Sequence, residues 1–145
     1  MPKLLVLRGL PASGKSTYAR ELLASYPAGS ALRINNDELS LMMFGSAYGG
    51  GANTAQLLGK LRIELVRLAF RNHYELVIVD NTNLVEKGVS RLRELAGECG
   101  ADFELDDSFL DVPLAVCLER NAGRENPIPE KVIIEMSRFL DGKLG

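Results

Sequence analysis

Short apolar runs alternate with longer amphipathic segments along the chain. The runs Lys3–Leu7, Ala31–Asn35 and Leu76–Asp80 predict three strands, and Phe103–Leu110 contains a fourth. The segments between them have helical spacing. This alternation predicts an α/β domain in which helices flank both faces of a parallel sheet.

The helical segments can be placed from their apolar stripes and their boundary residues. One stripe is formed by Leu57, Leu61, Leu65 and Leu68, with Asn53 as the expected cap, and another by Val85, Val89, Leu92, Leu95 and Cys99. Two further helices are expected to start at Thr17 and at Glu38. Two more are expected over Pro113–Asn121, with Asp111 as the cap, and over Glu130–Leu140. Four glycines between Phe44 and Gly51 predict a mobile loop.

The segment from Gly9 to Ser16, GLPASGKS, fits the phosphate-binding pattern G-x-x-x-x-G-K-[ST] at every fixed position. It lies between a predicted strand and a predicted helix, which is the setting of a P-loop. Lys15 is then expected to reach the β- and γ-phosphates of ATP, and the Ser16 hydroxyl to hold Mg²⁺. The predicted ATP-binding residues are Gly9, Pro11, Ala12, Ser13, Gly14, Lys15, Ser16 and Thr17. The alternative is a chance glycine-rich loop.

Polar residues follow the ends of the second and third predicted strands. Asp37 could accept a proton from a substrate hydroxyl, or it could cap the helix that follows. Asp80 could hold Mg²⁺ or close a turn. Thr82 and Asn83 could position the acceptor or form that turn. Parallel strands bring these residues to one edge of the sheet, where α/β proteins bind ligands.

Two groups of charged residues have opposite interpretations. Arg120 and Arg124 could clamp phosphates, and Gly123, Pro127 and Pro129 nearby predict a lid around residues 120–129. The alternative is a solvated basic helix end. The second group, Arg62, Glu64, Arg67 and Arg71, predicts a solvated helix face.

Composition limits the class of protein. The 145 residues fit one domain, and 46% hydrophobic and 25% charged residues are ordinary for a soluble protein. No apolar run has the length of a membrane span, and the start leaves no room for a signal peptide, so we expect a cytoplasmic protein in which Cys99 and Cys117 are buried thiols. The net charge of −2 means that a nucleic-acid partner would need a local basic site.

The motifs together resemble the phage-type 5′-polynucleotide kinase domain. The likeness includes the P-loop with Ala19-Arg20-Glu21, Ile34-Asn35-Asn36-Asp37, Asp80-Asn81-Thr82-Asn83-Leu84, Asp111-Val112-Pro113 and Leu118-Glu119-Arg120-Asn121, followed by Arg124 and Pro129. The resemblance implies an ATP- and Mg²⁺-dependent kinase acting on the 5′-hydroxyl of DNA or RNA, as in nucleic-acid repair. Lys15 and Ser16 would bind phosphate and metal, Asp37 would be the general base, and Arg124 would stabilise the transition state.

The chain departs from that family at two positions. The family's acceptor motif commonly reads Asn-Arg-Asp with a further arginine three residues after the aspartate, and those arginines are Asn36 and Ser40 here. A small-molecule kinase acting on a nucleoside, sugar or antibiotic is therefore the second hypothesis. A nucleotide-dependent switch that signals through residues 44–51 is a third. The chain could be a stand-alone kinase or a fragment.

Overall fold

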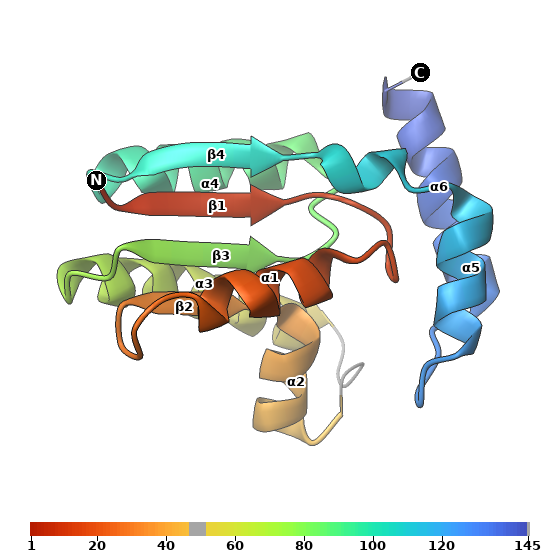
Figure 1. Cartoon of the computed structure of the whole chain (residues 1–145), viewed down its shortest axis with the longest axis horizontal. Coiled ribbons are helices and arrows are strands. Elements are labelled where there is room, and N and C mark those ends of the chain that lie inside the picture. The colour runs from red at the N-terminus through yellow and green to blue at the C-terminus, as the bar shows by residue number, and fades with distance from the viewer. Residues whose placement is uncertain (47–51, 145) are drawn as a thin grey trace.

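The computed structural model describes residues 1–46 and 52–144. The strands are β1 (Lys3–Leu7), β2 (Ala31–Ile34), β3 (Leu76–Asp80) and β4 (Asp102–Asp106). The helices are α1 (Lys15–Ala24), α2 (Asn36–Phe44), α3 (Ala52–Arg71), α4 (Glu86–Glu98), α5 (Leu114–Ala122) and α6 (Glu130–Leu144), with a 3-10 helix at Ser108–Asp111 (Figure 1). The element order matches the alternation expected from the sequence.

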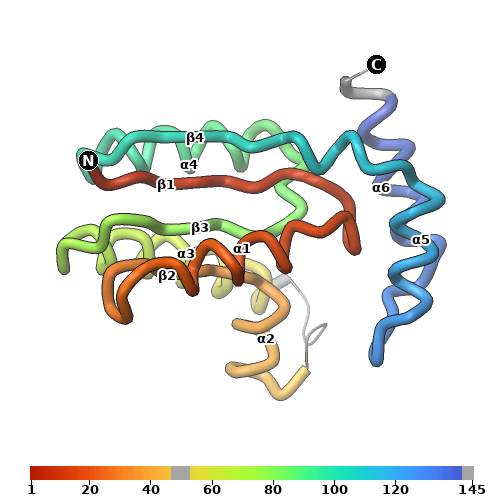
Figure 2. Tube along the Cα trace, in the orientation of Figure 1, coloured from red at the N-terminus to blue at the C-terminus, as the bar shows by residue number. Residues whose placement is uncertain are grey.

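The strands form one parallel sheet in the order β2-β3-β1-β4. Helix α1 covers one face, and α3 and α4 cover the other, which confirms the α/β P-loop fold (Figure 1). Helices α5 and α6 lie beyond the carboxyl ends of the strands and run across them (Figure 2). The same edge of the sheet therefore carries the P-loop and the α5–α6 pair.

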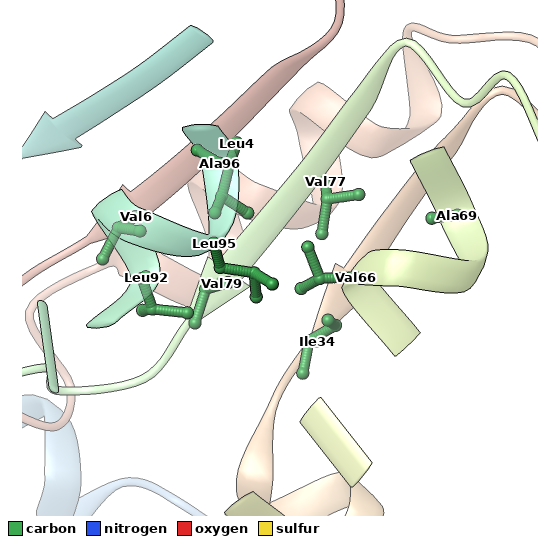
Figure 3. Close-up of a cluster of buried hydrophobic side chains, with 10 residues drawn as sticks. All are labelled: Leu4, Val6, Ile34, Val66, Ala69, Val77, Val79, Leu92, Leu95 and Ala96. Atoms are coloured by element: carbon green, nitrogen blue, oxygen red, sulfur yellow. The ribbon is translucent and has the colours of Figure 1, made fainter. Parts of the chain in front are cut away.

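The core has one layer on each face of the sheet because strand side chains alternate between the two faces. Leu4 and Val6 of β1 point to the α3–α4 face, and Leu5 and Leu7 point to the α1 face. The α3–α4 layer is completed by Ile34, Val66, Ala69, Val77, Val79, Leu92, Leu95 and Ala96 (Figure 3). Strand β3 is buried along its whole length, so the strand ends that carry polar residues are held in fixed positions.

The leucine stripe expected on α3 is wrong at its two ends. Leu57 and Leu68 are 45% and 50% exposed, whereas Leu61 and Leu65 are half-buried and Leu65 packs against the core. The residues of α3 that are buried against the sheet are Val66 and Ala69, with Ile63 and Phe70 packed beside them. On the next helix, Val85 is also exposed, because it is the residue that precedes α4.

Two expected helix caps are also wrong. Helix α3 begins at Ala52, so Asn53 lies inside it. Asp111 ends the 3-10 helix, and α5 starts after Pro113 without a side-chain cap. Helix α2 ends at Phe44, where the expected mobile loop begins. Residues 47–51 of that loop lie outside the described part of the chain.

Two further findings concern composition. Within residues 1–46 and 52–144, no helix combines the length and apolarity that a bilayer span requires. Both cysteines are free thiols; Cys117 is buried and Cys99 is half-buried.

Candidate active site

A cavity of about 770 Å³ opens at the carboxyl edge of the sheet, a size typical of small-ligand sites. Its lining comes from the P-loop and α1, from the ends of β2 and β3, and from the segment that joins α5 to α6. These residues are Pro11–Tyr18, Arg20, Glu21, Asn35–Asp37, Asp80–Thr82, Arg120, Arg124, Ile128, Val132 and Met136. Of the predicted site residues, only Gly9 and Asn83 are not part of this lining.

Two residues of the P-loop have positive φ angles. Gly14 has φ 104° and precedes α1, and Ala12 has φ 63°. Positive φ at Gly14 carries little steric cost, since glycine has no Cβ. Gly9 is required for another reason, because a Cβ there would lie 2.7 Å from Cβ of Phe109. Phe109 in turn packs on Tyr18, with ring centroids 5.7 Å apart.

Lys15 is folded back into the P-loop. Its Nζ donates to the carbonyl oxygens of Gly9 at 2.9 Å and Leu10 at 2.8 Å, and the side chain is buried. Burial lowers the pKa of Lys15 to about 8, and the nearby Asp80 carboxylate opposes this shift. The ammonium group is therefore only partly compensated, and an anion in the cavity would favour its charged form.

Asp80 is held by an arginine that the sequence analysis did not single out. Arg33 of β2 donates to Oδ2 of Asp80 from Nε at 2.9 Å and from Nη2 at 2.7 Å. Its Nη1 bonds Glu38 of α2 at 2.7 Å, and Glu38 also pairs with Arg20 of α1 at 3.2 Å. A chain of charges thus links the end of β3 to the two helices that border the cavity.

The residues proposed to hold Mg²⁺ fit that role. Oδ1 of Asp80 is buried and has no hydrogen-bond partner in the described structure. Asp80 and Ser16 both line the cavity. The described residues contain no cluster of three His, Cys, Asp or Glu. One carboxylate and one hydroxyl suit Mg²⁺, which takes few protein ligands and relies on substrate phosphates and water.

Asp37 does not cap α2. The cap is Asn35, whose Oδ1 accepts from the backbone N–H of Glu38 at 3.0 Å. The Asp37 carboxylate instead lies on the cavity wall, close enough for the charges of Arg124 and Lys15 to act on it. Partial shielding from water raises the pKa of Asp37, an effect that Arg124 opposes. The capping alternative for Asp37 is therefore wrong.

Asn36 connects α2 with the turn after β3 and with α3. Its backbone N–H donates to Oδ1 of Asn81 at 2.8 Å, and its own Oδ1 accepts from Nη1 of Arg62 on α3 at 2.9 Å. Arg62 and Arg67 are both half-buried, but Arg67 pairs with the exposed Glu64 and Glu98, whereas Arg62 bonds a residue of the cavity lining. The expectation of a solvated face on α3 is therefore wrong at Arg62.

The turn after β3 places Thr82 and Asn83 differently. Thr82 lines the cavity, and its carbonyl oxygen accepts from Gly9 N–H at 3.2 Å. The amide of Asn83 donates to the Leu7 carbonyl oxygen at 2.7 Å. The backbone carbonyl oxygen of Asn83 accepts from Nε of the buried Arg8 at 2.9 Å. Thr82 therefore lies beside the cavity, and Asn83 fastens the turn to the end of β1.

The arginines of the expected lid both face the cavity. Arg124 and Arg120 line it, and Nη1 of Arg120 lies 3.7 Å from where a Cβ on Gly14 would be. The segment that carries Arg124 is fixed by Asn121, which is buried. Its amide donates to the Ile128 carbonyl oxygen at 2.7 Å and accepts from Ile128 N–H at 2.9 Å.

The sequence analysis missed two kinds of residue at this site. Arg33 and Arg62 do not line the cavity but hold the lining residues Asp80 and Asn36, which are 47 and 26 residues away in sequence. The apolar wall made by Ile128, Val132 and Met136 comes from α6 and the loop before it. Alternation along β2 could have shown only that Arg33 and Asn35 share a face of the strand.

The model of the AAA domain family matches residues 4–142. The chain belongs to this family. Because that match includes the P-loop, the ends of β2 and β3 and the α5–α6 segment, the whole cavity lies within the family domain.

Three similar proteins are informative. L-seryl-tRNA(Sec) kinase of Methanococcus maripaludis is 27% identical over 139 residues, which cover 95% of this chain and 52% of the relative. A chain of the Pnkp1/Rnl/Hen1 RNA repair complex superposes with a TM-score of 0.81 at 24% identity, over 99% of this chain and 45% of that one. This chain therefore spans about half the length of each.

The third is APS kinase CysC of Mycobacterium tuberculosis in complex with AMPPNP and APS. It superposes with a TM-score of 0.60 at 17% identity, over 97% of this chain and 98% of that chain. These likenesses show that the P-loop kinase fold is shared among proteins with different acceptors. The fold alone therefore does not specify the acceptor, which depends on the residues of the site.

Proposed function

We propose that this chain is an ATP- and Mg²⁺-dependent kinase domain, spanning residues 1–145, that phosphorylates the 5′-hydroxyl of DNA or RNA. The observation that carries the proposal is the placement of Asp37. Asn35 caps α2, which leaves the Asp37 carboxylate on the cavity wall within electrostatic reach of Lys15 and Arg124. A carboxylate facing phosphate-binding cations is the arrangement that phosphoryl transfer to a hydroxyl requires.

The proposed reaction uses the two sides of the cavity together. Lys15 exchanges its bonds to the Gly9 and Leu10 carbonyls for the β- and γ-phosphates of ATP, which stabilise its charged form. Asp37 accepts the proton of the acceptor hydroxyl as that oxygen attacks the γ-phosphorus. Thr82 and Asn81 border the space for the acceptor. Ser16 and Asp80 would hold Mg²⁺, which neutralises charge on the β- and γ-phosphates when bound.

The lid arginines complete the proposed mechanism. In the P-loop kinase mechanism, negative charge moves toward the bridging oxygen of the leaving ADP as the bond to γ-phosphorus breaks. Arg124 and Arg120 line the cavity beside Asp37 and Gly14, so their guanidinium groups can stabilise that charge. Residues 120–129 act as the lid.

A small-molecule kinase is the second candidate. The observation in its favour is that neither Asn36 nor Ser40 carries a cationic side chain toward an acceptor strand. Ser40 is buried and its hydroxyl donates to the Ser46 carbonyl oxygen at 2.6 Å, so an arginine does not fit there without rearrangement. A nucleotide-dependent switch remains the third candidate.

Labelled phosphate transfer separates these candidates. The purified chain is incubated with γ-³²P-ATP, Mg²⁺ and either a 5′-hydroxyl oligodeoxynucleotide, the matching oligoribonucleotide, a nucleoside or a sugar. We expect label on an oligonucleotide and none with Lys15→Met. Label on the nucleoside or sugar alone would favour the small-molecule kinase, and release of inorganic phosphate without a labelled acceptor would favour the switch.

A further inference from the structure

Arg8 is a buried arginine behind the cavity. It follows the last residue of β1 and directly precedes Gly9, the first residue of the P-loop. It is 4% exposed and does not line the cavity. Its Nε donates to the backbone carbonyl oxygen of Asn83 at 2.9 Å, and its Nη1 pairs with the Glu86 carboxylate at 2.8 Å. Both bonds of the guanidinium group therefore go to the segment that joins β3 to α4.

The burial of Arg8 is costly. A buried guanidinium loses its hydration, and the Glu86 side chain that faces it is 64% exposed, so the charge is balanced from the solvent side. Nη2 of Arg8 is also buried, and it has no hydrogen-bond partner within the described residues. An apolar side chain of similar length would fill the same space without these costs. Packing alone does not explain an arginine at this position, whereas its bonds can.

The bond to Asn83 acts on a turn with an uncommon backbone conformation. Asn83 has φ 50°, in the left-handed region, and such a residue persists when the contacts around it determine its conformation. The Asn83 side chain donates to the Leu7 carbonyl oxygen at 2.7 Å. The Thr82 carbonyl oxygen accepts from Gly9 N–H at 3.2 Å. Of these contacts and the bond from Arg8, it is the bond from Arg8 that orients the peptide group following Asn83.

The same turn carries residues of the cavity lining. Asn81 and Thr82 both line it. Oδ1 of Asn81 accepts from the backbone N–H of Asn36 at 2.8 Å, immediately before Asp37. A movement of the turn would therefore displace both the space proposed for the acceptor and the start of α2. The bonds of the Arg8 side chain do not include residues 11–17, which are proposed to bind the phosphates of ATP.

We propose that Arg8 is a positioning residue, which holds the turn at residues 81–83 in a fixed place relative to the P-loop and thereby aligns the acceptor with the γ-phosphate of ATP. The geometry of reacting atoms is narrow, and a displacement of about 1 Å can lower a rate about 100-fold. The effect of Arg8 on the rate rests on the proposed kinase function, whereas its effect on the turn does not. Glu86 has the smaller part, because it balances the charge of Arg8 without orienting the peptide group after Asn83.

The kinetic test separates the two substrates. Rates are measured with γ-³²P-ATP and the acceptor that the wild type labels, and the dissociation constant of ADP is measured by titration calorimetry. Arg8→Met should lower kcat/KM for the acceptor about 10- to 100-fold and leave the ADP affinity unchanged. Arg8→Lys should lose less, since one ammonium can bond Asn83 but cannot at the same time replace the fork that also reaches Glu86. Glu86→Gln keeps the bond to Asn83 and should stay close to wild type.

A second measurement needs no substrate. Amide hydrogen exchange, followed by NMR, reports on the N–H groups of Gly9 and Asn36, which are bonded to Thr82 and Asn81 of the turn. Arg8→Met should raise exchange at these two amides, while the amides of β3 keep their wild-type rates. Val66→Ala is the control, because it opens the core layer beneath α3 and should raise exchange in the strands instead.

Three results would overturn the proposal. One is a wild-type rate and wild-type exchange in Arg8→Met. Another is an equal rise of exchange at Gly9, Asn36 and the β3 amides, as expected if Arg8 contributes only to global stability. The third is a loss of ADP affinity as large as the loss of rate, which would assign Arg8 to the P-loop. Arg8→Lys provides the same comparisons if Arg8→Met does not fold. A wild type that labels no acceptor would contradict the proposed function, and the exchange experiment would still test Arg8.

Discussion

Two walls of the cavity are built in opposite ways. The wall proposed to bind ATP, here called the donor wall, is one continuous segment, residues 11–17, whose backbone shape depends on Gly14 at φ 104°. The wall proposed to bind the acceptor, here called the acceptor wall, is assembled from residues 35–37 and 80–82, held together by contacts between distant parts of the chain. A continuous wall can be recognised as a motif in any sequence that carries it, whereas an assembled wall exists only in the folded chain.

The walls also treat charge differently. Lys15 on the donor wall is buried, and its pKa falls to about 8 because burial disfavours the ammonium ion. Asp37 on the acceptor wall is exposed, yet shielding by the cavity raises its pKa. Both shifts weaken the charged forms. Phosphate binding would stabilise the charged form of Lys15, and the raised pKa makes Asp37 a stronger base, so each shift suits the role proposed for its wall.

The largest expected effect comes from Arg124, which faces both walls. Arg124→Ala should lower kcat by about 10³- to 10⁵-fold, the range of arginine fingers, with little change in KM for ATP. The measurement is steady-state kinetics with the acceptor that the labelled-phosphate experiment identifies, and Arg138→Ala, at an exposed residue of α6, is the control. A change confined to KM would show that Arg124 contributes to ground-state binding only. No change in either constant would favour the alternative, in which Arg124 belongs to a solvated basic helix end.

The next effect isolates the acceptor wall. Asp37→Asn should lower kcat about 10²- to 10⁴-fold by removing the base. The raised pKa means that wild-type kcat/KM falls, as pH drops, at a higher pH than an ordinary aspartate would give. In the unfolding equilibrium, a carboxyl whose pKa rises on folding favours the folded state at low pH and opposes it above the folded pKa. Asp37→Asn should therefore not lower stability at neutral pH.

Two measurements check this prediction. Kinetics across pH should show that the acidic limb is lost in Asp37→Asn, and chemical denaturation should show an unchanged or higher free energy of unfolding. Asp111→Asn, at an exposed aspartate of the 3-10 helix, is the control. A variant that unfolds more easily yet keeps its rate per folded molecule would contradict the base assignment.

The smallest effect is expected at Arg33, which holds Asp80 of the acceptor wall. Arg33→Lys keeps the charge but cannot make the paired bonds to Oδ2 of Asp80. We expect a loss of about 1–3 kcal/mol in the free energy of unfolding, since a buried carboxylate oxygen loses a donor. The Mg²⁺ concentration for half-maximal rate should also rise. Arg91→Lys, which alters the exposed pairs with Glu94 and Glu98 on α4 and lies outside the cavity lining, is the control. Equal losses in both variants would contradict a positioning role for Arg33.

The contrast between the walls explains what the sequence could predict. The P-loop, the strands and the polar residues at their ends depend on neighbours in the chain, so pattern and spacing locate them. Arg62 could not be separated from Arg67, because the difference between them lies in Asn36, Glu64 and Glu98. Spacing alone also predicts one buried stripe of Leu57, Leu61, Leu65 and Leu68 on α3, but only its middle is half-buried, because contact with the sheet is centred on Val66 and Ala69.

The same limit applies to the caps. Asp37 and Asp111 each precede or begin a helical pattern and have the side chain that caps prefer. Which residue becomes the cap depends on where the first turn forms, and a shift of two residues gave that role to Asn35. In the sequence, Asn36 and Ser40 stand out only because they replace two arginines of the resembling family. Their bonds to Arg62 and Ser46 depend on the folded α2.

The bonds of Asn121 have a consequence for the thermodynamics of the proposed lid. They tie the two ends of segment 121–128 together, and the Arg124 N–H adds a bond to the Asn121 carbonyl oxygen at 3.1 Å. Ordering a loop costs about 1–2 kcal/mol per residue in backbone entropy, whereas fixing one arginine side chain costs up to about 2 kcal/mol. The backbone cost of this segment is met when the chain folds. In the proposed mechanism, ATP binding would then immobilise the side chains of Arg120 and Arg124 and not the backbone, so more of the binding energy would be left to act on the transferring phosphoryl group.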